Sequence, residues 1–204
     1  MSALAHEAPC DPGLDEVLWQ AWKAMDLPEG YRAEIIEGSI EVSPTGRRRH
    51  GVLTNRLRWL LEAHLRDTGL RVFQDVNVIR GRKVCVPDLF VGPEDLDEIP
   101  DEEGLGVDAT RVALVAEVVS PGTDAHRRDH IRKQRWYAQA GVPVYLVIDD
   151  FDDFDDQGTV TVFSGPDPER ATYATKTTVA YGTPVVVPDG PAKGLEITET
   201  LTRP

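Results

Sequence analysis

Two apolar runs separated by a helix-length segment constrain the fold of this chain more than any other feature. Residues 112–119 read VALVAEVV and residues 142–149 read VPVYLVID, so a strand formed by either run would be apolar on almost every side. Strands of this kind are typical of the centre of a sheet that helices cover on both faces. Residues 125–140 between the runs are predicted to form a helix that ends at Gly141. This order predicts strand, crossover helix and strand in an α/β fold.

The remaining elements are predicted from apolar periodicity and from turn residues. An amphipathic helix is expected over 14–25 and a hairpin over 32–42, and a second amphipathic helix follows a turn over 43–46. Further strands are expected over 70–79, 84–91, 158–164, 171–178 and 184–188. The predicted architecture is a mixed central sheet flanked by helices, with a C-terminal antiparallel β extension. We expect a flexible leader over residues 1–13 and a single domain over 14–204.

The acidic net charge of −13 does not by itself exclude a nucleic-acid partner, because the charge is unevenly distributed. Residues 94–108 contain eight acidic residues and residues 149–156 contain six, and without these the net charge would be +1. Basic residues gather at 47–49 and 126–135, where contact with phosphate groups is a reasonable use for them. The acidic segments are most simply interpreted as solvated surface.

Cysteine content and hydropathy limit the class of protein. The two cysteines are too few for a disulfide framework or a thiolate zinc site. No apolar run approaches the roughly 18 residues that a membrane-spanning helix needs. The N-terminus lacks a basic region followed by an apolar stretch, so a cytoplasmic location is predicted.

Two carboxylates lie within apolar runs, Asp88 in CVPDLFV and Glu117 in LVAEVVS. An ionised group in a low-dielectric interior has to be paired, ligated or neutralised. If the two strands are neighbours, the carboxylates meet at one edge of the sheet, and a hard cation such as Mg²⁺ or Mn²⁺ between them would relieve their repulsion. The alternative is that arginine or backbone donors satisfy each acid separately.

The predicted helix after Glu117 carries a candidate cation. Asp129 and Lys133 stand four residues apart and therefore share one helix face. They could form an ordinary surface ion pair, which is what the spacing alone favours. Alternatively, Lys133 could point at the sheet edge and stabilise charge on a phosphoryl oxygen.

The combined spacing of these residues resembles the Uma-type family of restriction endonuclease domains, in the PD-(D/E)xK nuclease superfamily. The resemblance covers about residues 14–200. It is carried by Pro87-Asp88, by Glu117-Val-Val-Ser-Pro121, by Asp129-x-x-x-Lys133-x-x-x-Tyr137, by Tyr145-x-x-x-Asp149, by Arg32-Ala-Glu34-Ile-Ile-Glu-Gly38, and by Ser43-Pro44 with His50. It implies a restriction-endonuclease-like fold.

The resemblance also implies roles for individual residues. The superfamily lysine normally follows the second acid by two residues, but Val119 occupies that position here, and Lys133 on the next helix takes its place. The implied catalytic residues are Asp88, Glu117, Lys133 and Glu34, with Asp88 and Glu117 as ligands of Mg²⁺ or Mn²⁺. The implied substrate-binding residues are His50, Arg127, Arg128 and Asp129.

The expected function is a metal-dependent endonuclease that hydrolyses DNA phosphodiester bonds, and a homodimer would allow both strands to be cut. One alternative is a catalytically weak or inactive nuclease-fold module that binds a protein or nucleic-acid partner. A third is a phosphohydrolase that acts on small nucleotides.

Overall fold

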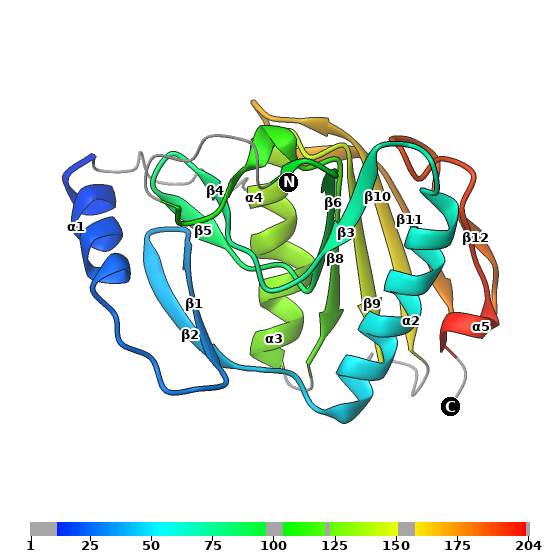
Figure 1. Cartoon of the computed structure of the whole chain (residues 1–204), viewed down its shortest axis with the longest axis horizontal. Helices are drawn as coiled ribbons and strands as arrows, with labels where there is room; N and C mark the ends of the chain where they lie inside the picture. The colour runs from blue at the N-terminus through cyan, green and yellow to red at the C-terminus, as the bar shows by residue number, and fades with distance from the viewer. Residues whose placement is uncertain (1–11, 97–103, 121–122, 151–157, 203–204) are drawn as a thin grey trace, which may run out of the picture.

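A six-stranded mixed sheet forms the centre of the molecule (Figure 1). The structure is a computed structural model that describes residues 12–96, 104–120, 123–150 and 158–202. In spatial order the strands are β11 (Thr172–Ala180), β10 (Thr159–Asp167), β9 (Val144–Asp149), β8 (Leu114–Val119), β6 (Leu89–Pro93) and β3 (Leu70–Phe73). β8 and β9 are parallel, and the other neighbours in this sheet are antiparallel.

The predicted crossover helix connects the parallel strands β8 and β9. The connection consists of α3 (Thr123–Arg127), a π-helical segment η3 (Arg128–Lys133) and α4 (Gln134–Ala140). It ends at Gly141, whose φ of 77° is the left-handed conformation that favours glycine after a helix. All six residues of β8 and of β9 are buried, which confirms the interpretation of the two apolar runs as central strands.

A second mixed sheet packs beside the first. Its strands in spatial order are β2 (Ser39–Pro44), β1 (Tyr31–Ile36), β5 (Lys83–Cys85), β4 (Val78–Arg80) and β7 (Val107–Asp108). β1 and β2 form the predicted hairpin. Both residues of its two-residue loop, Glu37 and Gly38, have positive φ, which matches the twist of the strands on either side.

Two predicted strands are each divided between the sheets, so the predictions of continuous strands over 70–79 and 84–91 were wrong. The first run bends at Asp75, whose φ is 57°, and becomes β3 and β4. The second breaks at residues 86–88 and becomes β5 and β6. Pro87 lies in this break, where its missing N–H removes a donor that a continuous strand would need. Asp88 therefore lies just before β6 rather than inside a strand.

Helices cover both faces of the six-stranded sheet (Figure 1). On one face Leu53, Leu57 and Leu61 of α2 (Arg48–His64) pack with α5 (Glu199–Thr202) and the small sheet of β12 (Val185–Val186) and β13 (Glu196–Ile197). On the other face Trp136 and Tyr137 of α4 pack against the sheet. α1 (Pro12–Lys23) lies against β1 and β2, and a short 3₁₀ turn η2 (Ala109–Arg111) precedes β8.

The predicted α/β architecture of mixed sheets with flanking helices is thus confirmed. Of the predicted C-terminal strands, β10 and β11 extend the central sheet, and β12 pairs with β13 in a separate antiparallel sheet. Most of the predicted leader and parts of both acidic segments lie outside the described residues. In the described ranges every helix is too short or too polar to cross a membrane.

Candidate active site

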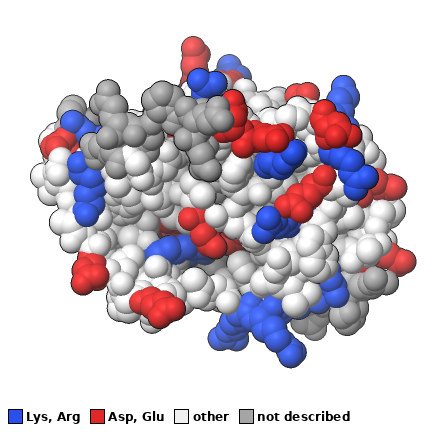
Figure 2. Space-filling view, in the orientation of Figure 1, with Lys and Arg blue, Asp and Glu red and all other residues white. Residues whose placement is uncertain are grey.

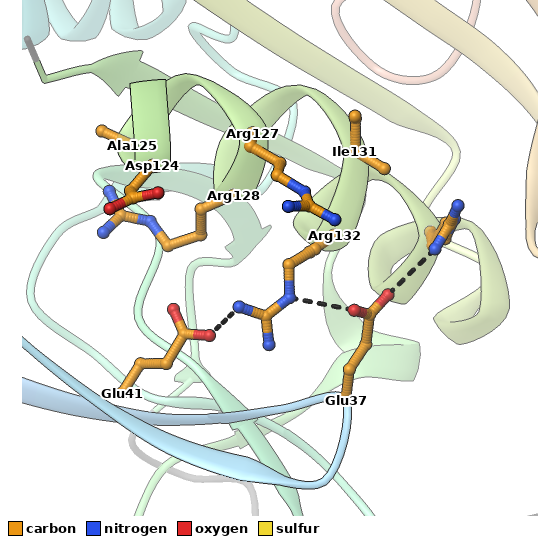
Figure 3. Close-up of a pocket in the computed structure, with 9 residues that line it drawn as sticks. Glu37, Glu41, Asp124, Ala125, Arg127, Arg128, Ile131 and Arg132 are labelled. Atoms are coloured by element: carbon orange, nitrogen blue, oxygen red, sulfur yellow. Dashed lines mark hydrogen bonds and ion pairs between the residues drawn. The ribbon is translucent and has the colours of Figure 1, made fainter. Parts of the chain in front are cut away.

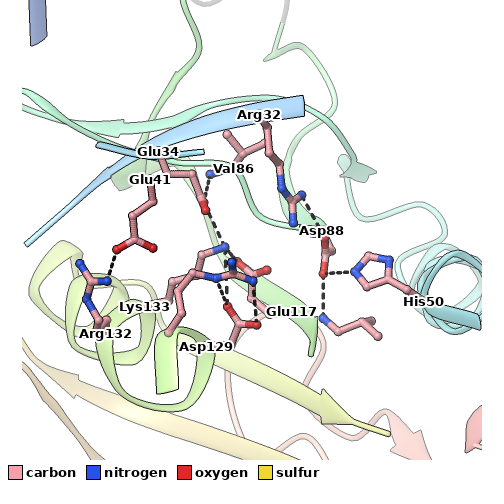
Figure 4. A network of polar contacts seen from close by, with 12 residues as sticks. Arg32, Glu34, Glu41, His50, Val86, Asp88, Glu117, Asp129, Arg132 and Lys133 are labelled. Atoms are coloured by element: carbon pink, nitrogen blue, oxygen red, sulfur yellow. Dashed lines mark hydrogen bonds and ion pairs between the residues drawn. The ribbon is translucent and has the colours of Figure 1, made fainter. Parts of the chain in front are cut away.

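Carboxylates from three places in the fold gather around one buried lysine, which pairs with two of them, Glu34 and Glu117 (Figure 4). Glu34 comes from β1, Glu117 from β8 and Asp88 from the break before β6, and Lys133 is the last residue of η3. Leu89 is paired with Ala116 in the antiparallel register of β6 and β8, so Asp88 comes next to Glu117 one position further along. The structure therefore brings the two acids of the sequence prediction together, where the start of β6 lies beside β8 in the interior of the sheet.

Lys133 is fully buried among carboxylates. Its Nζ lies 2.8 Å from Oε1 of Glu117, 3.0 Å from Oε1 of Glu34 and 4.0 Å from Oδ1 of Asp129. Burial disfavours the charged ammonium, but the three acids outweigh it and raise the pKa of Lys133 above its ordinary value. The prediction that Asp129 and Lys133 form an ion pair at the surface was wrong, because both side chains are buried.

Glu117 resists ionisation in this cluster. Burial, together with the nearby charges of Asp88, Asp129 and Glu34, raises the pKa of Glu117 to about 8 against the opposing effect of Lys133. Its Oε1 accepts hydrogen bonds from Lys133 and from the hydroxyl of Tyr137, at 2.8 and 3.0 Å. Near neutral pH this side chain is therefore largely neutral, while Lys133 stays charged.

Asp88 is held in the opposite state, as a carboxylate. Its Oδ1 accepts from both terminal nitrogens of Arg32 at 3.1 Å, and its Oδ2 lies 2.9 Å from Nε2 of His50 and accepts from the Val118 N–H at 2.8 Å. Burial acts to raise the pKa of Asp88, but the His50 hydrogen bond and the Arg32 charge lower it well below its usual range. Burial acts to lower the pKa of His50. The hydrogen bond to Asp88 and the charge of Asp88 outweigh this effect and raise the pKa of the imidazole.

The two remaining acids each have a donor of their own. The backbone N–H of Val86 donates to Oε1 of Glu34 at 2.7 Å. Arg128 forms two hydrogen bonds to the carboxylate of Asp129, at 2.9 and 3.3 Å, and the Tyr145 hydroxyl donates to the Asp129 backbone carbonyl at 2.7 Å. These contacts fix η3 against the sheet, and η3 positions Lys133. π-helical turns are often found at functional sites.

Beside this cluster lies an open pocket of about 620 Å³ (Figure 3). Arg127 and Arg128 line it from the crossover helix, and Glu37 and Glu41 line it from the hairpin. Arg132 lies between the two elements, donating to Glu37 at 2.9 Å and to Glu41. Arg127 is exposed and pairs with no carboxylate of the described ranges.

His50 lies apart from Arg127 and Arg128. It lines a second, smaller pocket of about 40 Å³ together with Arg47 and Arg49 at the start of α2. Figure 2 shows Lys and Arg side chains gathered at the lower edge of the molecule, where α2 begins in Figure 1. The predicted substrate-binding residues thus divide into two groups on either side of the acidic cluster, with Asp129 inside it.

The resemblance implies a bound divalent ion, and the carboxylates of this cluster can be compared with the ligands that such an ion prefers. Carboxylate oxygens of Asp88 and Glu117 are the hard ligands that Mg²⁺ and Mn²⁺ prefer. Lys133 and Tyr137 both reach Oε1 of Glu117, so neither uses its Oε2. Asp88 would have to release a present partner, because Arg32 and His50 already contact its two oxygens. The carboxylates of Asp88 and Glu117 are therefore chemically suitable ligands for the ion. The ion would compete for them with the cationic side chains that contact them now.

Arg32 is the residue of this cluster that sequence reasoning missed. A usable signal was present, because Arg32 stands two residues before Glu34 and alternate residues of a strand share one face. Its guanidinium is mostly buried, and burial is outweighed by Asp88, Glu117 and Glu34, which raise its pKa. Its Nε–H is buried and has no hydrogen-bond partner in the described part of the chain.

Comparison with known proteins gives three results. Residues 19–200 match the model of a protein family described as "Uma2: Putative restriction endonuclease". The fold is similar to that of a protein from Anabaena variabilis described as a putative nuclease belonging to DUF820, with a TM-score of 0.65 and 18% identity, over 91% of this chain and 97% of that one. A search of the curated proteins finds no match.

Proposed function

Because this chain belongs to the Uma2 family of restriction-endonuclease-like proteins, we propose that it is a metal-dependent nuclease that hydrolyses DNA phosphodiester bonds. The observation that carries the proposal is the meeting of Asp88 and Glu117 where the start of β6 lies beside β8, with the ammonium of Lys133 on Glu117. A fully buried cluster of ionisable groups with perturbed pKa values is a candidate for catalysis.

In this mechanism Asp88 and Glu117 would hold Mg²⁺ or Mn²⁺. Such an ion, when bound, neutralises charge on a phosphoryl oxygen and lowers the pKa of a water. Glu117 has to lose its proton to act as a ligand, and Lys133 at 2.8 Å favours that loss. Lys133 then donates hydrogen bonds to the attacking water or to the phosphoryl oxygen, and Glu34 holds the ammonium in place at 3.0 Å. His50, Arg127 and Arg128 are proposed to bind flanking phosphates.

The sharpest test of activity is the Glu117→Gln variant. Glutamine has nearly the shape of a neutral glutamic acid, which is the state that a pKa of about 8 already favours near neutral pH, so the variant should stay folded. We expect nicking of supercoiled plasmid in Mg²⁺ or Mn²⁺ to fall at least about 100-fold, because a metal acting as a Lewis acid is worth several kcal/mol to the transition state.

The matched control for that test is Glu196→Gln, an exposed acid on β13 far along the chain, which should nick like the wild type. Equal nicking by the wild type and Glu117→Gln would remove Glu117 from the mechanism. Hydrolysis of small model phosphodiesters without plasmid cleavage would instead indicate an enzyme that acts on small nucleotides.

DNA binding should depend on Arg127. Because this exposed arginine lines the large pocket, an Arg127→Gln variant should bind DNA several-fold more weakly and reduce the slope of log affinity against log salt by about 1. The free energy of unfolding should change by less than about 0.5 kcal/mol. Fluorescence anisotropy over a salt series measures the slope. Arg170→Gln, at a side chain 82% exposed, serves as the control, and equal slopes for both variants would place the DNA elsewhere.

A second candidate function is a nuclease-fold module that binds a partner and has weak or no activity. It is favoured by the pairing of Asp88 with Arg32 and of Glu117 with Lys133, which leaves the acids satisfied by the protein's own cations. A module of this kind would bind DNA or protein but would show no metal-dependent nicking. Homodimer formation and a cytoplasmic location stay predictions.

A further inference from the structure

A second group of possible metal ligands lies outside the acidic cluster. Within the ranges that the structure describes, His126, His130 and Asp149 form one group whose ligand atoms all lie within 4.8 Å of one another. Nε2 of His130 is 2.9 Å and Nε2 of His126 is 3.4 Å from Oδ2 of Asp149. The two imidazole rings stack with their centroids 4.2 Å apart. Both rings therefore present a nitrogen to the same carboxylate oxygen.

The fold explains this meeting. His126 is in α3 and His130 is in η3, four residues on, so both lie on one side of the crossover helix. Asp149 is the last residue of β9 and is paired with Val119 at the end of β8. Glu117 is paired with Val147 in the same register, so Asp149 lies on the same face of the sheet as Glu117, one strand across and two residues further. The two groups are neighbours that share no ligand.

The chemistry of the donors indicates the kind of ion. Two imidazole nitrogens and one carboxylate oxygen form a ligand set that zinc and similar transition-metal ions accept, whereas Mg²⁺ prefers oxygen alone. With bonds of about 2.0–2.1 Å, neighbouring ligand atoms lie about 3.3 Å apart around a tetrahedral ion and about 2.9 Å apart around an octahedral one. The two separations from Oδ2 of Asp149, 3.4 and 2.9 Å, lie close to this range, and all three ligand atoms lie within 4.8 Å of one another.

Exposure also fits a binding site. Asp149 is 1% exposed, so its carboxylate is fixed in position. The His126 side chain is 39% exposed and that of His130 is 12% exposed, so the group opens to solvent on the His126 side. Three protein ligands with one open side are typical of a site that keeps a position for water or for a substrate atom.

We propose that His126, His130 and Asp149 bind one divalent transition-metal ion of the zinc class, with an open coordination position toward solvent. The site is separate from the Asp88 and Glu117 pair. Because η3 carries both His130 and Lys133, an ion bound here also ties the helix that positions Lys133 to the end of β9.

The test uses Zn²⁺ and Co²⁺ with the full chain in the Glu117→Gln background, so that the acidic pair does not contribute. Calorimetry with Zn²⁺ should give a stoichiometry of one bound ion per chain. Bound Co²⁺ should absorb visible light more strongly than Co²⁺ in water, as expected for a site with fewer ligands than the hydrated ion. His126→Ala should weaken Zn²⁺ binding by at least about tenfold, since even the loss of a residue that only supports a ligand costs 10–100-fold. His130→Ala and Asp149→Asn should do the same.

His64→Ala, at an exposed histidine near the end of α2, is the control and should bind Zn²⁺ as the background does. Because His126 is partly exposed, its alanine variant should keep the circular dichroism spectrum of the parent. No heat with excess Zn²⁺, or equal affinity in the His126→Ala and His64→Ala variants, would overturn the proposal and leave a hydrogen-bonded cluster. Neither result would bear on nicking in Mg²⁺, which depends on Asp88 and Glu117.

Discussion

A Lys133→Met variant is expected to lose about 3–5 kcal/mol of the free energy of unfolding, which is the usual cost of removing one partner from a buried ion pair. Methionine has a similar length and no charge, so the change isolates the ammonium. Without it, Glu117 and Glu34 lose a cation at 2.8 and 3.0 Å in a site that is closed to water. Since small domains are stable by only about 5–15 kcal/mol, this loss is large.

Urea unfolding at pH 7.5 with EDTA measures the difference. Lys193→Met, at an exposed lysine near the C-terminus, removes the same charge at the surface and should change stability by less than about 0.5 kcal/mol. If Lys133→Met lost as little as Lys193→Met, Lys133 could not be the counter-ion of the buried acids.

The second large effect is a fall in stability as the pH rises toward 8 in the absence of metal. The pKa of Glu117 is about 8 in the folded chain and 4.5 in its ordinary state. Between these values the folded chain holds a proton that the unfolded chain has released, so each step up in pH favours unfolding. The contribution of Glu117 is fully present below pH 4.5 and is lost progressively up to about pH 8, with a total size of a few kcal/mol.

Comparison with Glu117→Gln isolates this effect from that of other groups. His50, whose pKa is also raised, contributes stability that is likewise lost as the pH rises, but it is present in both proteins. Asp88, whose pKa is lowered, acts in the opposite direction and only in acid. The stability of the wild type relative to Glu117→Gln should therefore fall between pH 5 and pH 8, measured by urea unfolding at each pH. Parallel curves over this interval would mean that Glu117 titrates normally.

Much of the fold could be predicted because local patterns and the tertiary structure agree. The two doubly apolar runs became β8 and β9, and the Glu37-Gly38 loop closed the predicted hairpin. The divided strands could not be predicted from hydrophobic alternation, because β5 and β6 are both buried and the pattern continues through residues 86–88. Pro87 marks the break, but the packing of the second sheet is what shows that the chain passes between sheets there.

The site was predicted as a set of residues and not as a network of contacts. Spacing of four residues places Asp129 and Lys133 on one helix face but does not say that this face is turned to the sheet. Arg32 lies 56 residues before its partner Asp88, and the partner of His130 lies 19 residues away, at Asp149. Such pairs depend on strand register and on how the crossover helix packs, which no local pattern contains.

The central claim is that Asp88 and Glu117 take up a divalent ion between β6 and β8, and calorimetric titration with Mn²⁺ tests it most directly. The titration is made in the His130→Ala background, so that the histidine group does not contribute, with and without the further change Glu117→Gln. The account predicts one bound Mn²⁺ per chain in the first protein, with affinity that rises with pH up to about 8 as Glu117 loses its proton, and no binding in the second. Equal heats in the two proteins, or no heat in either, would contradict it.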